Sequence, residues 1–399
     1  MSETPEGWTN QPLAKFFKRL TRKNAECNQN ALTISAQKGL VNQKEFFNKY
    51  VASSNLEGYY LLHKGDFAYN KSYSAGYPMG VIKRLEKYEK GVVSTLYICF
   101  EPTSINTSPD FFLKYFESGL FNSELKTIAQ EGGRAHGLLN VSVKEFFDLL
   151  VPDVPAEEQQ KIASILSSVD RVIDLTEQEI NKLKDLKKGM MQELLTKGIG
   201  HTKFKDSPVG RIPESWKVST VGKVCKIENN LRKPISRYER EKIKGSYPYY
   251  GPTKIQDYIN EYRVSGTYAL IGEDGDHFNK FDKQPMTQLA YGKFNVNNHA
   301  HLIGDSKNCS PEWFYSFFMH KDITSYLSRQ GATRLKLTKA ILEELPIVLP
   351  TKSEQLAIFD RISASTSLSK RKESKLRQLK LLKNGLMQDL LTGKVRVKI

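Results

Sequence analysis

The sequence contains little cysteine and no long apolar run. The cysteines lack the CxxC or Cys/His spacing of a zinc site and are too few for a disulfide scaffold; they are Cys27, Cys99, Cys225 and Cys309. No stretch approaches the roughly 20 consecutive apolar residues that a membrane helix requires. These absences argue against a zinc module, a disulfide-stapled domain and a membrane protein. We expect a chain that works in a reducing cytoplasm and contacts no membrane.

The sequence also lacks the motifs of common catalytic sites. It has no GxxxxGK(S/T) phosphate loop, no GxGxxG after a predicted strand, no Asn-Pro-Pro-aromatic tetrapeptide, no HExxH and no GxSxG. The best enzyme-like pattern is Asp110 followed by Glu124 and Lys126, a spacing compatible with a metal-dependent nuclease. The equivalent stretch at Glu312 lacks the following acid and lysine. We therefore expect no catalytic residues, no metal site and no cofactor on this chain, with a stand-alone Mg²⁺-dependent nuclease as an alternative.

Positive charge is in clear excess. The chain carries 60 Lys and Arg against 44 Asp and Glu, a formal net charge of +16. Segment 366–399 alone has ten basic and two acidic residues, so eight of the sixteen surplus charges lie there. A surplus of this size favours a polyanionic partner, either nucleic acid or an acidic protein.

The chain contains an internal repeat. At an offset of 196, residues 183–196 match residues 379–392 at ten of fourteen positions. The same offset pairs Gln159 with Gln355 and Ile162 with Ile358, so about forty residues repeat without a gap. The sequences between these shared segments have little in common. A period this long indicates a duplicated module, with a variable block and a shared segment in each copy.

The shared segments are predicted to be long helices. Ten positions of the first alternate in spacing between four and three, and eight are apolar, which is typical of a coiled-coil seam: Ile162, Leu166, Val169, Ile173, Thr176, Ile180, Leu183, Lys187, Met190 and Leu194. The second has Ile358, Ile362, Leu376, Leu379, Leu386 and Leu390 at matching places, with a polar middle at Ser365, Ser369 and Lys372. About forty helical residues span roughly 60 Å. We expect the two helices to bury their seams against each other; two separate partner-binding helices are the alternative.

The variable blocks have the composition of globular domains. Both mix short β-like runs with Gly, Asn and Asp turns, and each has a Ser-Pro-acid triplet that opens an aromatic-rich helix, expected over 109–121 and 311–327. The predicted fold class is α/β: two α/β domains separated by two long antiparallel coiled-coil helices in an internal pseudo-two-fold repeat. The expected divisions are 1–150 for the first block, 151–200 for the first helix, 201–345 for the second block and 346–399 for the second helix.

Loop composition predicts candidate DNA contacts, with ordinary surface-loop side chains as the alternative for each residue. Asn pairs with adenine, Lys and Arg reach guanine or phosphate, acids accept from cytosine, and aromatic rings stack or contact thymine methyl groups. In block one the candidates are Tyr69, Asn70, Lys71, Ser72, Tyr73, Tyr77, Arg134 and His136. In block two they are Tyr249, Tyr250, Lys254, Asp274, His277, Lys280, Thr333 and Arg334.

On these motifs the sequence resembles the specificity (S) subunits of type I restriction-modification enzymes. The resemblance covers nearly the whole chain. It rests on the Glu-Gln-Gln-Lys-Ile-Ala run ending at Ala163 with its copy ending at Ile358, and on Gly-Met-Met-Gln-Glu-Leu-Leu-Thr196 with its copy ending at Thr392. In block two, 249–251, 270–275 and 331–335 resemble recognition-domain signatures of that family, whereas block one shares mainly 65–67 and 70–72.

The resemblance implies a non-catalytic subunit that reads a split DNA target, one half-site per block, with the helices setting the spacing. Implied partners are double-stranded DNA, two modification (methyltransferase) subunits and two restriction subunits. S-adenosylmethionine, ATP and Mg²⁺ would belong to those partners, and this chain would bind no cofactor. An adaptor that binds only proteins is a second alternative.

The helix ends are also expected to dock the modification subunits, because methionine-rich apolar patches adapt to partner surfaces. The alternative is that these side chains only fill the seam. The candidates are Met190, Met191, Leu194, Leu386, Met387 and Leu390.

Overall fold

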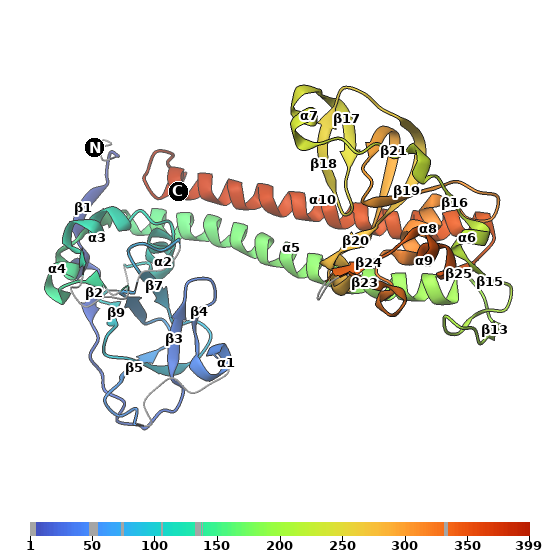
Figure 1. The fold of residues 1–399 in the computed structure, drawn as a ribbon. Helices are drawn as coiled ribbons and strands as arrows, with labels where there is room; N and C mark the ends of the chain where they lie inside the picture. Colours follow the sequence, from blue (N-terminus) through green and yellow to red (C-terminus); the bar gives the residue numbers. More distant parts are fainter. Residues whose placement is uncertain are drawn as a thin grey trace. The chain divides into compact units, whose positions relative to one another are not determined.

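The computed structural model describes residues 5–47, 55–72, 76–104, 107–131, 137, 139–330 and 334–399. The chain folds into two compact units, coloured along the sequence in Figure 1. Unit 1 comprises Met1–Glu177 with Ser374–Ile399, and unit 2 comprises Gln178–Glu373. Each unit therefore contains one of the predicted blocks together with one half of each long helix. The division between units falls inside the two long helices.

Unit 1 is built on a four-stranded antiparallel sheet in the order β2-β9-β6-β7. The strands are β2 (Phe17–Arg19), β9 (Ile98–Pro102), β6 (Phe67–Asn70) and β7 (Val81–Arg84). Helix α2 (Pro109–Glu117) packs on the sheet through aromatic rings: Phe17 lies edge-on to Phe67, to Phe100 and to Phe112, with ring centroids 5.3, 5.2 and 5.1 Å away. An aromatic core of this kind buries much apolar area in a small block.

The remaining elements of unit 1 form short pairs and turns around this sheet. The hairpin β3–β4 and the antiparallel pair β5–β8 enclose a smaller second core. The elements are β1 (Thr9–Pro12), η1 (Leu13–Lys15), β3 (Leu32–Ser35), β4 (Gly39–Asn42), α1 (Gln43–Phe47), β5 (Tyr60–His63), β8 (Lys90–Val93), α3 (Asn122–Ile128), β10 (Gln130–Glu131), β11 (Leu139–Asn140), α4 (Val143–Asp148) and β12 (Leu150–Asp153).

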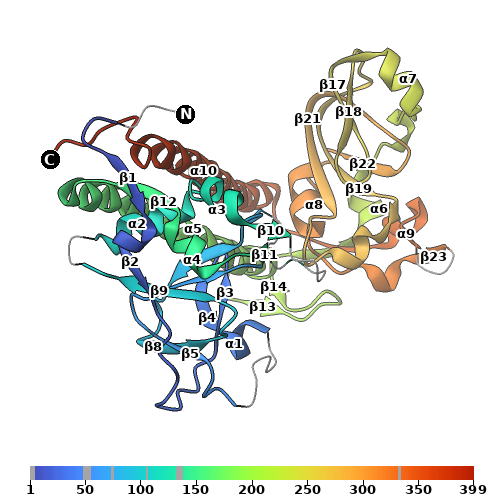
Figure 2. The ribbon, with the colours of Figure 1, turned by 90° about the vertical axis from the view of Figure 1, so that its left-hand side faces the viewer.

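Unit 2 has a six-stranded sheet in the order β16-β22-β19-β21-β17-β18. The strands are β16 (Lys226–Ile227), β22 (Ala300–Gly304), β19 (Val264–Gly272), β21 (Thr287–Val296), β17 (Lys244–Tyr250) and β18 (Ile255–Ile259). Its first four strands occupy the same order as β2-β9-β6-β7 of unit 1. The hairpin β17–β18 is an addition, joined to β21 by a short parallel pairing and visible beside it in Figure 2.

Shorter elements surround the sheet of unit 2. They are β13 (Phe204–Lys205), β14 (Ile212–Pro213), β15 (Lys217–Thr220), α6 (Val221–Val224), η2 (Asn229–Leu231), α7 (Arg237–Lys242), β20 (Asp274–Gly275), η3 (Asp276–Lys280), α8 (Pro311–Phe318), η4 (Thr324–Tyr326), β23 (Ser328–Gln330), β24 (Arg334–Lys336), α9 (Lys339–Glu344) and β25 (Pro346–Leu349). The antiparallel pair β15–β25 corresponds to β1–β12 of unit 1. The α/β fold class is thus confirmed, and the repeat extends into the blocks.

The helices opened by the Ser-Pro-acid triplets are shorter than predicted. Ser108 and Ser310 cap them as expected, each accepting a hydrogen bond from the backbone three residues on. The first helix ends at Glu117, near Gly119, which has a positive φ, and α3 follows separately. The second ends at Phe318. Aromatic composition alone therefore overestimated both lengths.

The two long helices are α5 (Ala156–Lys197) and α10 (Lys352–Leu390). In unit 1, Ile162 and Leu166 of α5 share a core with Met387 and Leu390 of α10. In unit 2, the opposite ends share a core that includes Met191, Leu194, Ile358 and Ile362. Because the start of each helix packs with the end of the other, the pairing is antiparallel, as predicted. All ten predicted seam positions of α5 are buried or half-buried, and Ser365, Ser369 and Lys372 of α10 are half-buried.

A buried glutamine connects each block to its long helix. In unit 1, Gln159 Oε1 accepts from the backbone N–H of Ser108 at 2.9 Å, and its amide donates to the Val154 carbonyl at 2.8 Å. In unit 2, Gln355 Oε1 accepts from the N–H of Ser310 at 2.9 Å, and its amide donates to the Pro350 carbonyl at 3.1 Å. The same side chain thus holds the capping residue of the aromatic helix in both copies.

The preceding glutamate repeats as well. Trp8 Nε1 donates to Glu158 at 3.0 Å, and Trp216 Nε1 donates to Glu354 at 3.2 Å. The two carboxylates differ in their other hydrogen-bond donors. Arg396 binds Glu158, whereas the backbone N–H of Ile199 and the ring of His201 bind Glu354.

Replacing the buried amide is expected to destabilise the unit that contains it. Gln159→Leu or Gln355→Leu leaves the N–H of a half-buried (Ser108) or buried (Ser310) serine and a backbone carbonyl without partners, which costs about 1–3 kcal/mol of unfolding free energy. Urea denaturation of the full chain measures the change. The control is Gln160→Leu on the exposed face of α5, for which we expect a change within about 0.5 kcal/mol. Equal losses at Gln160 and Gln159 would contradict the assignment.

Candidate nucleic-acid interface

The candidate recognition loop of unit 2, residues 273–280, follows strand β19. The chain passes from Gly272 into the two-residue strand β20, which pairs with β24 and so lies in a small sheet of the order β20-β24-β23. A Cβ at Gly272 would lie 2.7 Å from the ring of His277, and Gly275 has φ 140°, a conformation that side-chain-bearing residues rarely adopt. Both glycines are therefore required for the loop to close over His277.

Charged side chains of opposite sign meet on this loop. Asp274 lies 3.3 Å from His299 Nδ1 and 3.7 Å from Arg334 Nη2. Arg334 is 61% exposed and His299 is 50% exposed, whereas Asp274 is only 13% exposed. Asp274 thus holds two outward-facing donors in place, which is an arrangement suited to base edges or phosphates. The sequence pattern missed His299, because it lies 25 residues from Asp274 and only the fold brings it near.

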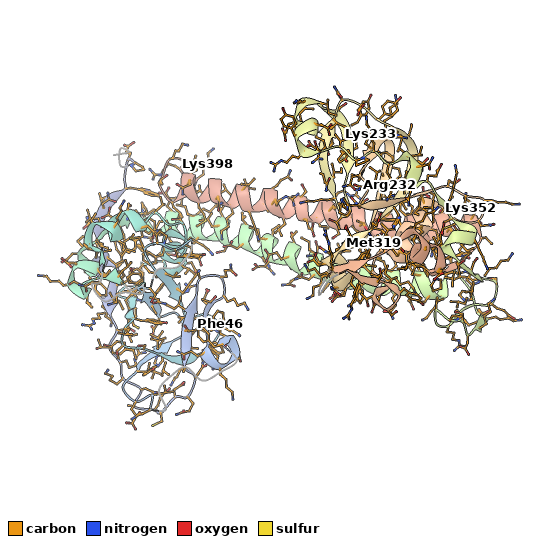
Figure 3. The ribbon with its side chains drawn as sticks, viewed as in Figure 1. Phe46, Arg232, Lys233, Met319, Lys352 and Lys398 are labelled. Atoms are coloured by element: carbon orange, nitrogen blue, oxygen red, sulfur yellow. The ribbon has the colours of Figure 1, made fainter. Side chains whose placement is uncertain are left out.

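The neighbouring Glu273 is paired inward. It accepts from Arg232 at 2.9 Å and lies 4.0 Å from Lys336. Arg232 also donates to the Asn298 carbonyl at 3.1 Å, and Figure 3 places it in unit 2. These contacts secure the base of the loop and leave Asp274 to pair with the exposed side chains of His299 and Arg334.

His277 is buried beneath the loop. It is 4% exposed, and its ring lies 4.1 Å from that of Phe278. Burial lowers the pKa of His277 below its ordinary value, so its ring is neutral in the folded protein at pH 7. Its prediction as a DNA contact is corrected because it has no exposed edge to offer. Lys280, by contrast, is exposed and paired with Asp276 at 2.5 Å.

Tyr249 is also a structural residue. It is 1% exposed; its hydroxyl accepts from the N–H of Ile235 at 2.9 Å and donates to the Lys233 carbonyl at 3.1 Å. Its prediction as a DNA contact is therefore corrected. Tyr250 is half-buried against Phe294.

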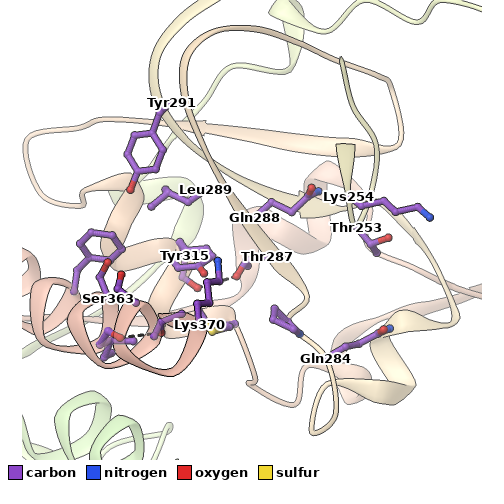
Figure 4. A pocket seen from close by; sticks show the side chains of 16 residues that line it. Thr253, Lys254, Gln284, Thr287, Gln288, Leu289, Tyr291, Tyr315, Ser363 and Lys370 are labelled. Atoms are coloured by element: carbon purple, nitrogen blue, oxygen red, sulfur yellow. Dashed lines mark hydrogen bonds between the residues drawn. The ribbon is translucent and has the colours of Figure 1, made fainter. Parts of the chain in front are cut away.

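Lys254 lies on an exposed turn at the mouth of a cavity of about 700 Å³ in unit 2. Figure 4 shows this cavity, with Lys254 and Thr253 on one side and Lys370 of α10 on another. Lys254 therefore remains a candidate for contact with a nucleic acid.

The matching loop of unit 1 follows strand β6. Leu139 N–H donates to the Lys71 carbonyl at 3.0 Å, as Leu337 N–H donates to the Glu273 carbonyl at 2.7 Å in unit 2. The predicted segments of the two blocks thus occupy equivalent places. Asn70 accepts from the N–H of Ser72 at 3.0 Å.

Tyr69 is the third correction. It is completely buried, its hydroxyl donates to the Met79 carbonyl at 2.8 Å, and its ring stacks on Phe146. It belongs to the aromatic core and has no surface for a base. Lys71 is half-buried, whereas Ser72 and Tyr77 are exposed. Four further candidates lie outside the described residues: Tyr73, Arg134, His136 and Thr333.

The predicted subunit-docking residues mostly fill the cores. The side chains of Met191, Leu194, Met387 and Leu390 are at most 8% exposed within this chain. Their prediction as an interface is corrected, since they pack the seam instead; Met190 and Leu386 are half-buried. Other apolar residues of the long helices are exposed, and two pairs of them are repeat copies at the offset of 196: Val172 with Leu368, and Leu186 with Leu382.

Among the described residues, no three His, Cys, Asp or Glu side chains are grouped to hold a metal ion. Asp110, the first residue of the nuclease-like pattern, pairs with Arg84 at 2.6 Å and lies in the first turn of α2. None of the helices in the described part of the chain is both long and apolar enough to cross a membrane.

The chain matches a family of known proteins. The model of the type I restriction modification DNA specificity domain matches residues 5–185 and 213–380. A Methanocaldococcus jannaschii protein named as a type I restriction enzyme MjaX specificity subunit is 32% identical over 273 residues, which cover 66% of this chain and 64% of that protein. The MjaVIII specificity subunit of the same organism is 28% identical over 327 residues, covering 78% and 76%. The chain thus spans slightly less than two thirds of the first relative's length.

Solved structures share the fold. A type I restriction-modification system S subunit from M. genitalium superposes with a TM-score of 0.56 at 12% identity, covering 100% of this chain and 98% of that one. A chain from a structure concerned with the complex assembly and conformational transition of a type I R-M system gives a TM-score of 0.56 at 14% identity, covering 99% and 100%. At such identities the likeness concerns the fold alone.

The burial of His277 predicts a pH dependence for the stability of unit 2. Because its pKa is lowered in the folded state, the unfolded chain binds more protons once the pH falls below about 6.5, and stability is lost in that direction. We expect His277→Phe, which keeps an aromatic ring but cannot titrate, to reduce this loss. Thermal melting between pH 7.5 and about 5 measures it, with the exposed His299→Gln as control. An unchanged pH profile in His277→Phe would contradict the prediction; His301, whose pKa burial also lowers, accounts for a residual dependence.

Proposed function

Because the chain belongs to the type I restriction modification DNA specificity family, we propose that it is the sequence-recognition subunit of a type I restriction-modification complex. In this function it reads a duplex DNA target in two parts, one half-site per block. The observation that carries the proposal is the repeated frame: both blocks use the same order of four strands, and both place a polar loop after the equivalent strand, β6 or β19. Two copies of one frame with unlike loops suit two unlike half-sites.

Exposure and charge indicate which residues of unit 2 would contact bases and which would contact phosphates. Arg334 presents a planar fork of donors, which matches guanine O6 and N7 in the major groove. Asp274 orients this fork from behind, and His299 adds a second donor beside it. Among the described residues Lys254 has no carboxylate partner, and its exposed ammonium can reach a neighbouring phosphate. In unit 1 the corresponding contacts are Asn70, Lys71, Ser72 and Tyr77.

The chemistry of such a complex is proposed to lie on partner subunits. Methyl transfer with S-adenosylmethionine, and ATP-driven cleavage with Mg²⁺, would belong to the modification and restriction subunits, while this chain supplies base recognition and a scaffold without binding a cofactor. The nuclease alternative is disfavoured by the ion pair that occupies Asp110. Cleavage of DNA by the isolated chain with Mg²⁺, lost in Asp110→Ala, would restore it.

Exposed apolar residues on the long helices are proposed to dock the modification subunits. Each unit exposes one residue of each repeated pair: Val172 and Leu382 in unit 1, and Leu186 and Leu368 in unit 2. An exposed leucine side chain is unfavourable in water, and covering it with a partner lowers the free energy of the complex. Since the pairs are copies, one kind of partner can use both, which agrees with two modification subunits per specificity subunit.

Removing the proposed guanine contact tests the recognition function. We expect Arg334→Ala to weaken binding of the assembled complex to its target by about 1–3 kcal/mol and to relax base choice at one position of one half-site. Single-molecule methylation mapping of the source genome identifies the target, and fluorescence anisotropy on target and altered duplexes measures the effect. The control is Arg237→Ala on the exposed face of α7. A wild-type complex that binds target and scrambled duplexes equally would favour the protein-only adaptor.

A charge on the repeated leucines tests the docking face. We expect the double change Leu186→Asp and Leu382→Asp to abolish co-purification with the modification subunit, because an aspartate cannot be buried unpaired in an apolar interface. The chain itself should keep its melting temperature, since both leucines are exposed. The matched control is Gln192→Asp with Gln388→Asp, a pair of exposed repeat copies. Retention of the modification subunit by the leucine variant would rule out docking at these positions.

A further inference from the structure

A groove in unit 2 is lined by an excess of lysines. It is a cavity of about 700 Å³ between the second half of α5, segment 281–283 and the end of α8 with the residues that follow it. Its floor is apolar and includes Met191, Phe281 and Phe317. One acidic residue, Asp282, faces five lysines, a set that we call the lysine groove: Lys184, Lys187, Lys188, Lys283 and Lys321.

Two of these lysines are partly buried without a counter-ion. Within the described part of the chain, neither Lys187 nor Lys321 has a carboxylate within the 4.0 Å of an ion pair, whereas Lys184 lies 3.8 Å from Glu373. Burial lowers the pKa of Lys187 and the nearby charge of Lys370 lowers it further, while the carboxylate of Glu373 only partly opposes them. Burial also lowers the pKa of Lys321, whose ammonium lies 4.7 Å from the centre of the Phe317 ring. A partly buried ammonium is unfavourable unless an anion approaches it.

The internal repeat shows that the groove lacks a carboxylate that is present in unit 1. The copy of Lys187 in unit 1 is Lys383, which pairs with Asp170 at 2.6 Å. Asp170 also binds Lys114 at 2.7 Å, so unit 1 neutralises this position with its own carboxylate. In unit 2 the residue at the copy of Asp170 is Thr366, whose hydroxyl donates to the Ile362 carbonyl at 2.9 Å. The same frame therefore contains a complete ion pair in one unit and a lysine without its acid in the other.

The groove lies close along the chain to the recognition loop. Helix η3 follows Gly275 directly and ends at Lys280, and the next three residues line the groove. On α10, Lys370 belongs to the cavity that Lys254 also lines (Figure 4). Lysines thus continue from the loop onto the long helices of unit 2. The spaced single charges of these lysines lie next to a loop proposed to read bases. The regularly spaced phosphates of the same DNA duplex are the ligand that fits them best.

We propose that the lysine groove binds the DNA phosphate backbone beside the half-site read by unit 2, with Lys187 and Lys321 as its phosphate contacts. The inference rests on the proposed recognition function and deepens it. It assigns a sequence-independent part of the DNA affinity to residues outside the recognition loops. Unit 1 has no such contact at the equivalent place, since Asp170 already occupies Lys383. Attraction between these lysines and phosphates therefore adds to the binding of the half-site read by unit 2 and not to that of the half-site read by unit 1.

The salt dependence of binding tests the groove. The assembled complex is titrated with a short random-sequence duplex at several salt concentrations, and the logarithm of the affinity is plotted against the logarithm of the salt concentration. Each lost phosphate contact reduces the slope by about 0.9. We expect Lys187→Gln with Lys321→Gln to reduce the slope by about 1.8 and to weaken target and random duplexes by the same factor. The preference for target over random duplex should not change.

A second variant restores the acid that the repeat has lost. Thr366→Asp places a carboxylate at the copy of Asp170 and should pair Lys187 internally, so the slope falls by about 0.9 while every lysine remains. The matched control is Lys383→Gln in unit 1, whose lysine is already paired; it should leave the slope unchanged. Thermal melting of each variant verifies that unit 2 is folded.

Each outcome decides the proposal. Reduced slopes in both unit 2 variants, with an unchanged slope in Lys383→Gln, support it. An unchanged slope in the unit 2 variants overturns it, and loss of the modification subunit from those variants without a change in slope would identify an acidic protein segment as the occupant instead. Failure of the recognition function is separate, because it would show as equal binding of target and random duplexes by the wild-type complex whatever the slope.

Discussion

Each unit depends on one buried glutamine at the start of a long helix. Gln159 and Gln355 accept a hydrogen bond from the serine that caps the aromatic helix of the block, and they return one to the chain just before the long helix. A buried amide must satisfy both its donor and its acceptor, so this contact leaves the block little freedom relative to its part of the helix. The core aromatic residues and the β1–β12 and β15–β25 pairs then assemble around that junction.

The constancy of this junction allows the rest of each block to differ. The four-strand order is the same in both units, yet unit 2 adds the hairpin β17–β18 and unit 1 adds the β3–β4 and β5–β8 pairs. Asp170 beside Lys383 and Thr366 as its copy show the result: one unit closes an ion pair, and the other exposes a cationic groove.

The candidate contacts show how far loop composition is informative. Tyr69 and Tyr249 stand in Gly-rich, polar surroundings that are typical of binding loops, yet both lie in strands and face a core. Their neighbours Ser72 and Lys254, a few residues on, are exposed. The change from strand to loop falls between them, and composition does not mark it. His299 shows the opposite error, since nothing in its local sequence connects it to Asp274.

The sequence by itself determined the repeat, the two long helices with their seams, the serine caps and the class of protein. The repeat, the helices and the caps are recorded in local spacing or in the match between two segments of the same chain, and the class of protein in motifs that resemble a known family, so no three-dimensional knowledge was needed. Only the tertiary structure decided which tyrosines are core, which lysines lack an acid, and that the blocks share one strand order. Those properties depend on approaches between residues far apart in the chain, such as Lys383 with Asp170, and the spacing of residues along one segment carries no information about them.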